Sequence, residues 1–115
     1  MKQILLIMTL AITQLSHADL ECYNNSNLVA YTSQSKKSVS LTVFSVKTSE
    51  KIRLDTVMCF ECDASEINYF AQSKSGDEAI ITGMSTNGKN FTGTLNLKRL
   101  KDKEEIISVS CENSN

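Results

Sequence analysis

The residues best suited to chemistry in this chain are its four cysteines, Cys22, Cys59, Cys62 and Cys111. Cys59 and Cys62 form a C-x-x-C motif, which can serve thiol–disulfide exchange, a zinc site or a structural disulfide. A thioredoxin-like site needs this motif at the start of a helix, whereas the downstream residues alternate like a strand and the acidic Glu61 and Asp63 disfavour a thiolate. A four-thiolate zinc site needs a second closely spaced pair, and the other two cysteines stand alone. An even set of cysteines in a small chain therefore predicts two structural disulfides and no metal, with redox chemistry at the C-x-x-C motif as the alternative.

The pairing of the cysteines has more than one solution. In an extended strand the Cα atoms of Cys59 and Cys62 would lie about 10 Å apart, beyond the roughly 7 Å that a disulfide tolerates. They can therefore bond each other only where Phe60-Glu61 forms a turn or the start of a helix. Cys22 and Cys111 lie where the first and last strands of a closed sheet would meet. We favour Cys22–Cys111 with Cys59–Cys62, while the crossed pairing, Cys22–Cys62 with Cys59–Cys111, stays open.

The first eighteen residues have the features of an export signal. Lys2 supplies a positive start, Ile4 to Ile12 an apolar core, and Ser16-His17-Ala18 the small residues that signal peptidase requires. The apolar run is shorter than the roughly 20 residues of a membrane-spanning helix. We predict a signal peptide at 1–18, a single β domain at 19–115, and export to the periplasm or the extracellular space without membrane insertion after cleavage.

Cleavage would remove His17, which is the only histidine of the chain. Without imidazole, Ser-His-Asp and Cys-His catalysis and histidine-containing metal sites are excluded. The formal net charge of -1 leaves no extended basic surface for nucleic acid. The sequence thus predicts a protein that is not an enzyme, uses no cofactor and binds no nucleic acid.

Short segments that alternate apolar and polar residues make up the rest of the chain, which is the pattern of half-buried strands. Asn87-Gly88 predicts a type I′ hairpin turn, the change of phase at Phe44 predicts a bulge, and the capping-box spacing of 63–66 predicts the one helical turn. The predicted fold is all-β, a small antiparallel barrel or sandwich of about seven strands stapled by disulfides. The expected strands are 28–31, 38–46, 52–56, 67–71, 79–83, 91–97 and 107–111.

One stretch carries a family resemblance. Lys74-Ser75-Gly76-Asp77-Glu78-Ala79, together with the export signal, an early cysteine, a run of strands and a late cysteine, resembles the bacterial periplasmic c-type lysozyme inhibitors. The inserted Ser75 departs from the family's stretch. The family's serine-glycine-x-x-tyrosine loop is matched in outline by Ser65 and Tyr69, with Glu66 in place of the glycine. The resemblance covers about ten residues and implies a small barrel whose loops plug the cleft of a hydrolase, with Ser65, Tyr69 and Lys74 as binding residues.

These observations predict an exported, non-enzymatic module that binds another protein. An inhibitor of a cell-wall hydrolase such as lysozyme is the specific form that the resemblance implies. Two alternatives stay open, a thiol–disulfide protein that uses Cys59 and Cys62, and a structural component of the envelope or surface. Small rigid scaffolds of this kind present loops for recognition.

Overall fold

A computed structural model of the chain describes residues 19–34, 38–60, 62–100 and 104–114, so the predicted signal peptide at 1–18 lies outside the described residues. Within these ranges the chain is built from strands, and no helix has the length and hydropathy needed to cross a membrane. The strands are β2 (Asp19–Asn24), β3 (Asn27–Gln34), β4 (Val39–Phe44), β5 (Lys51–Leu54), β6 (Thr56–Cys59), β7 (Glu66–Gln72), β8 (Glu78–Met84), β9 (Asn90–Lys98) and β10 (Glu105–Ser114).

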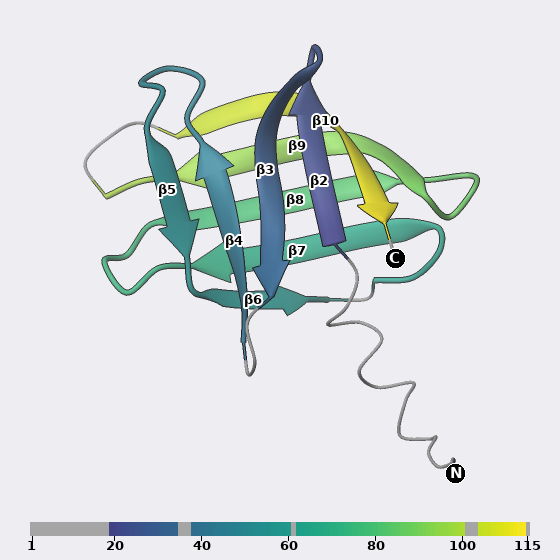
Figure 1. Cartoon of the computed structure of the whole chain (residues 1–115), viewed down its shortest axis with the longest axis horizontal. Helices are drawn as coiled ribbons and strands as arrows, with labels where there is room; N and C mark the ends of the chain where they lie inside the picture. The colour runs from purple at the N-terminus through teal and green to yellow at the C-terminus, as the bar shows by residue number, and fades with distance from the viewer. Residues whose placement is uncertain (1–18, 35–37, 61, 101–103, 115) are drawn as a thin grey trace, which may run out of the picture.

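All of these strands belong to one antiparallel sheet in the order β5-β4-β3-β2-β10-β9-β8-β7-β6. The sheet folds over on itself, so that β2 to β5 form a front layer that crosses β6 to β9 behind it (Figure 1). Strand β10 belongs to both layers, because it pairs with β9 in one and with β2 in the other. The two ends of the sheet, β5 and β6, are separated only by Asp55, and β6 packs against β4. The result is a nearly closed barrel, which confirms the all-β fold class.

Alternate side chains of each strand fill the space between the layers. In β7, Ile67, Tyr69 and Ala71 are buried, and the residues between them are partly exposed. This period of two is what a strand with one buried face requires. The largest fully buried side chains come from both layers and form one core: Phe91, Leu20, Leu41, Leu54, Ile67, Ile81, Leu95, Leu97 and Val43.

Both favoured disulfides are present, and the crossed pairing is excluded. Cys22 of β2 and Cys111 of β10 are directly opposite residues in register, with Cα atoms 3.9 Å apart, and both are buried. The Cα atoms of Cys59 and Cys62 are 5.8 Å apart because the chain bends after β6. The first bond spans 89 residues, and closing such a loop is worth about 4–5 kcal/mol in the chain-entropy model.

The sheet has 9 strands rather than about seven. The first addition is β2, whose sequence Asp-Leu-Glu-Cys-Tyr-Asn alternates but carries polar residues on its outer side. The second arises because the segment expected as one strand at 52–56 is interrupted at Asp55, after which β6 begins. Both additional strands, β2 and β6, are short and flanked by polar residues, and their burial depends on partners distant in sequence.

The hairpin predicted at Asn87-Gly88 exists between β8 and β9, but the predicted type I′ turn is wrong. The connection is longer than two residues, and Asn87 is not among the described non-glycine residues with positive φ, although Gly88 has a φ of 79°. A type I′ turn needs positive φ at both central residues. That condition is met between β2 and β3, where Asn25 and Ser26 have φ of 51° and 76° and flank the pair Asn24 and Asn27.

The bulge predicted at Phe44 is also wrong. Strand β4 keeps one register with β3 and β5 from Leu41 through Val43, and Phe44 continues it opposite Lys51. The register shift of the front layer lies instead in the β2–β3 pair, between Cys22 and Tyr23. Phe44 therefore breaks the apolar alternation because it points to the outer face of the sheet.

Glycine at position 93 is required by the close approach of β8 and β9. Gly93 is paired with Gly83 across the two strands. A Cβ atom on Gly93 would collide with the carbonyl oxygen of Thr82 and would lie 2.6 Å from the Gly83 Cα, both of them backbone atoms that cannot move aside. Glycine pairs of this kind mark sharp bends in barrel strands.

We expect Gly93→Ala to lower the free energy of unfolding by roughly 3 kcal/mol, because the added methyl group forces the two backbones apart. Gly83→Ala is the matched control. Its Cβ would lie 3.2 Å from the Phe91 Cβ and 3.4 Å from the Thr92 carbonyl oxygen, which is tight but without the overlap found at Gly93, so its effect is smaller. Urea denaturation of both variants measures the difference, and equal losses would contradict this account.

Candidate functional site

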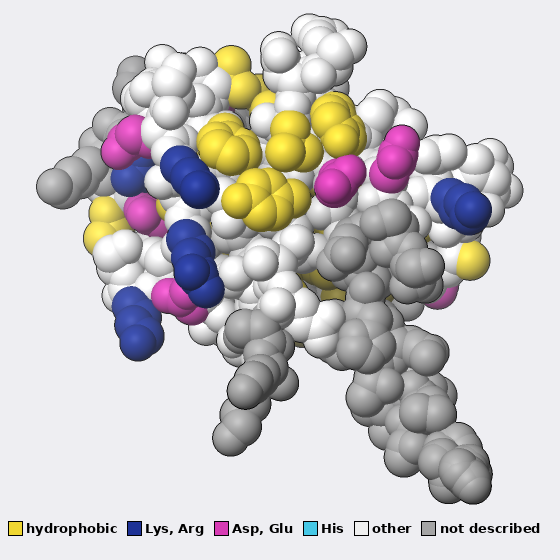
Figure 2. Space-filling model, in the orientation of Figure 1, with side chains coloured by type: hydrophobic (Ala, Val, Ile, Leu, Met, Phe, Trp, Pro, Cys, Tyr) yellow, Lys and Arg dark blue, Asp and Glu magenta, His cyan; other side chains and the backbone are white. Residues whose placement is uncertain are grey.

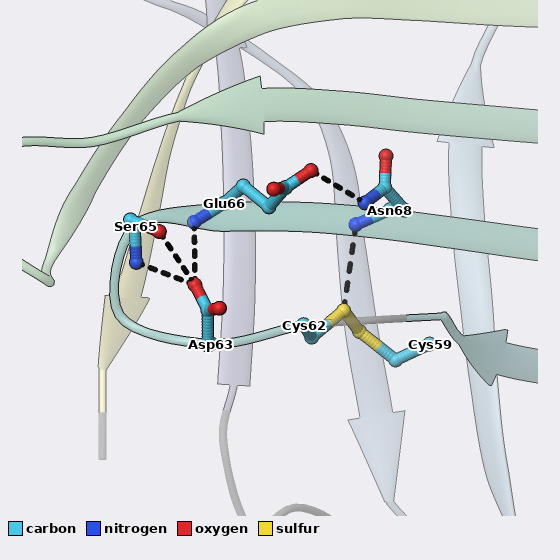
Figure 3. Close-up of a disulfide and its surroundings, with 6 residues drawn as sticks. All are labelled: Cys59, Cys62, Asp63, Ser65, Glu66 and Asn68. Carbon is cyan, nitrogen blue, oxygen red and sulfur yellow. Dashed lines mark hydrogen bonds between the residues drawn. A yellow bond between two sulfur atoms is a disulfide. The ribbon is translucent and has the colours of Figure 1, made fainter.

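The chain between β6 and β7 forms a loop that is closed by the Cys59–Cys62 disulfide (Figure 3). Both cysteines are half-buried and pack against the core. The Phe60 amide donates to the Asn68 carbonyl at 2.9 Å, and the Asn68 amide donates to the Cys62 sulfur at 3.4 Å. The loop is thus fixed to β7 on both sides of its bend.

A single carboxylate orders the second half of this loop. One oxygen of Asp63 accepts from the Ser65 amide at 2.7 Å, the Ser65 hydroxyl at 2.8 Å and the Glu66 amide at 3.0 Å (Figure 3). The Ser65 hydroxyl, followed by the two amides, lowers the pKa of Asp63. We refer to Asp63, Ser65 and Glu66 with these bonds as the Asp63 turn.

The helical turn predicted at 63–66 is wrong. Asp63 still accepts from the backbone amides that follow it, as a helix-capping residue would. The Asp63 amide donates to the Glu66 carbonyl at 2.9 Å, and the chain then enters β7. The buried alternation that starts at Ile67 outweighs the local preference for a helix, since burial of an apolar face contributes more than one cap.

The connection between β8 and β9 lies beside this loop. The Ser85 amide donates to the Ser65 carbonyl at 2.8 Å, and the open side of Gly88 faces Ala64. The Asn87 side-chain oxygen accepts from the Lys89 and Asn90 amides, both at 2.9 Å. Each connection is therefore internally bonded, and the two stabilise each other at one end of the barrel.

Apolar side chains remain exposed at this end. Phe60, between the two bonded cysteines, is 53% exposed, and Met58 just before them is 44% exposed. An aromatic ring in this position contributes little to the core. We call the described residues Cys59, Phe60 and 62–65 the disulfide loop.

The structure does not bring together the three residues implied by the family resemblance. Ser65 is exposed in the disulfide loop, but Tyr69 is only 8% exposed and lies in the core, where burial raises the pKa of its phenol. Lys74 is exposed beyond the other end of β7, roughly 20 Å or more from Ser65 at about 3.3 Å per residue. Their binding roles stay predictions, and the structure does not place the three side chains next to one another.

The Lys74 end of the barrel is tied together by charged side chains. Arg99 forms ion pairs with Glu50 of the β4–β5 turn and with Asp77 of the β7–β8 turn. The hydrogen bond from Arg99 lowers the pKa of Glu50. Glu105, which is buried, accepts from the Ser45 hydroxyl and the Val46 amide, both at 2.8 Å.

An open depression of about 200 Å³ lies beside Arg99, with Ser75, Asp77 and Leu100 as its other lining residues. Its charged groups are already engaged with each other, so this end serves the fold. Over the ranges given above, no group of three His, Cys, Asp or Glu side chains could hold a metal ion.

A second surface, which the sequence did not reveal, covers the outer face of the front layer. Figure 2 shows hydrophobic side chains gathered there, with Lys and Arg interspersed with Asp and Glu on the β5 side and two acidic groups on the opposite side. Tyr31 and Phe44 contribute two rings with centroids 6.1 Å apart. Tyr23 donates to Glu21 at 3.0 Å, and this bond raises the pKa of the Tyr23 phenol. In the sequence, this face is signalled only by Phe44, an apolar residue at a position of β4 where the alternation requires a polar one.

Comparison of the chain with protein-family models, with curated proteins and with solved structures gives no match. Function therefore has to be argued from the geometry of the disulfide loop and of the outer face.

The Asp63 turn should open in acid. In the folded protein the pKa of Asp63 lies below its ordinary value of 3.8. The ionised carboxylate therefore stabilises the fold at pH above the unfolded-state pKa. This stabilisation is lost as the pH falls through the folded-state pKa. We expect the amide NMR shifts of Ser65 and Glu66 to move together with a midpoint below 3.8, and Asp63→Asn to abolish the transition. A midpoint at or above 3.8 would contradict the hydrogen bonds.

The two disulfides should differ in their effect on stability. Replacing Cys22 and Cys111 by serine should lower the free energy of unfolding by about 4–5 kcal/mol, and replacing Cys59 and Cys62 by about 2 kcal/mol, because the second loop is short. Chemical denaturation measures both.

The same proteins test the redox alternative. Iodoacetamide should label no cysteine in the native oxidised protein, and mildly reduced protein should react slowly at neutral pH. Rapid labelling of Cys59 or Cys62 in a fold that survives reduction would favour thiol–disulfide exchange instead.

Proposed function

We propose that this protein is a non-enzymatic binding module that recognises another protein through the disulfide loop. The observation that carries the proposal is the combination of a fixed backbone and an exposed ring. The disulfide and the Asp63 turn hold the loop, yet Phe60 is 53% exposed. A loop ordered before binding loses little conformational entropy when it binds, and aromatic anchors supply much of the energy of protein interfaces.

An exposed aromatic side chain with exposed polar neighbours on a fixed backbone suits a cleft. Ser65 lies five residues after Phe60 in the same loop and is exposed. This arrangement supports the cleft of a cell-wall hydrolase such as lysozyme as the target, in line with the family resemblance. Contact would use the disulfide loop, whereas Lys74 lies at the other end of the barrel and would stay outside it.

Two disulfides also support export, since such bonds persist in oxidising compartments such as the periplasm and the extracellular space. A target in the cell wall or outside the cell would share that compartment.

The proposal is tested with Phe60→Ala. Binding of the oxidised protein to c-type lysozyme is measured by calorimetry, together with inhibition of the lysozyme's activity on cell walls. We expect Phe60→Ala to weaken binding at least tenfold, because truncating a central aromatic anchor typically removes about 2 kcal/mol or more.

Ile106→Ala is the matched control, because Ile106 is similarly exposed, at 62%, but lies on β10. It should bind like the parent protein. Absence of lysozyme binding would rule out this target. Lysozyme binding that Phe60→Ala does not weaken would rule out the disulfide loop as the binding surface.

A further inference from the structure

A row of directly opposed residues crosses the outer face of the front layer. The strand registers pair Arg53 with Thr42, Thr42 with Tyr31, Tyr31 with Glu21, and Glu21 with Glu112. Directly opposed residues point to the same face of a sheet at about 5 Å spacing. The row therefore runs from β5 to β10 with a cation at one end, an aromatic ring at its centre and carboxylates at the other end.

Neighbouring residues reinforce this arrangement. Lys51 lies opposite Phe44 and adds a second cation on the β5 side. Phe44 and Tyr23 flank Tyr31, and Leu28, opposite Tyr23, is 38% exposed. Figure 2 shows the resulting apolar centre between a β5 side that carries Lys and Arg together with Asp and Glu, and an opposite side where two acidic groups adjoin it. We call this surface the outer aromatic face.

The acidic side is locally unfavourable in the isolated chain. Glu21 and Glu112 are directly opposite each other, and like charges in that position destabilise a sheet. The charges of both also help to raise the pKa of the Tyr23 phenol. An external cation placed over Glu112 would relieve this repulsion.

The row is electrostatically complementary to a second copy of itself that is rotated by 180°. A two-fold axis that runs along β3 through Tyr31 would reverse the row, so that Arg53 of one copy lies over Glu112 of the other and the two Tyr31 rings meet. The Arg53–Glu112 pairing would occur twice and the Tyr31–Tyr31 contact once, on the axis, as in any isologous interface. A partner of uniform charge would instead be repelled by one side of the face.

We propose that the outer aromatic face binds a second copy of this chain in this two-fold arrangement. Arg53 is available for it, because its ion pair with Asp55 is long, at 3.4 Å, and joins side chains that are 67% and 51% exposed. Exposed pairs of this kind contribute little. The dimer is independent of the disulfide loop, which lies on β6 and β7.

The test is a charge-swap cycle on the purified oxidised protein. Sedimentation velocity over a concentration series gives the dimer dissociation constant at low and high salt. We expect Arg53→Glu and Glu112→Arg each to weaken dimerisation at least tenfold, and the double variant to recover most of the loss, because the two reversed charges again lie opposite each other. Tyr31→Ala should weaken it without recovery.

Lys98→Glu is the control for a charge reversal elsewhere, since Lys98 is exposed on β9, in the layer behind the outer aromatic face, and it should leave the dissociation constant unchanged. Thermal melts confirm that each variant is folded. A protein that stays monomeric at millimolar concentration, or a double variant no better than the single ones, would overturn the proposal. So would binding of a neutral hexasaccharide of N-acetylglucosamine to a monomer in a manner that depends on Tyr31.

Discussion

The pairing of β2 with β10 is the constraint on which the rest of the structure depends. Every other pair of neighbours in the described sheet consists of strands that follow each other in the chain. The barrel is therefore two meanders, β2 to β5 and β6 to β10, that are joined through Asp55 and through this one long-range contact. Cys22 and Cys111 place a covalent bond inside that contact, so its loop-closure entropy is removed from the unfolded state.

This division also separates the surfaces that are open to partners. The first meander, together with Glu112 of β10, presents the outer aromatic face, and the second carries the disulfide loop and the connection beside it. The charged cluster around Arg99 joins turns of both meanders at the remaining end. The two proposed binding surfaces and the charged cluster therefore use different side chains, so each can be altered separately.

The sequence was informative where local pattern decides the outcome. Alternation over Ile67, Tyr69 and Ala71 predicted a strand correctly, and it also implied that the Tyr69 side chain is buried. The favoured disulfides followed from spacing and compartment. The sequence predicts the type I′ turn at Asn87-Gly88, whereas it lies at Asn25-Ser26. The hairpin of β2 and β3 is not visible in the sequence, because β2 has few apolar residues and its other partner, β10, is distant in the chain.

The outer aromatic face and the disulfide loop were harder to predict for a related reason. Tyr23, Tyr31 and Phe44 lie on three strands, and only the registers show that they share one face. Phe60 was treated as a spacer between cysteines, because exposure of a side chain depends on what folds against it. Asp63 kept its capping chemistry while the backbone after it became a strand.

The short connection at Asp55 has a consequence for the behaviour of the protein at high concentration. It places the two free margins of the sheet, β5 and β6, next to each other, and each is only 4 residues long. Strands at a sheet margin are the usual template for intermolecular β-pairing and fibril growth, which short length and charged side chains oppose. Lys51, Arg53 and Asp55 supply those charges. Lys51 and Arg53, which lie at the β5 side of the outer aromatic face, thus also oppose uncontrolled strand addition.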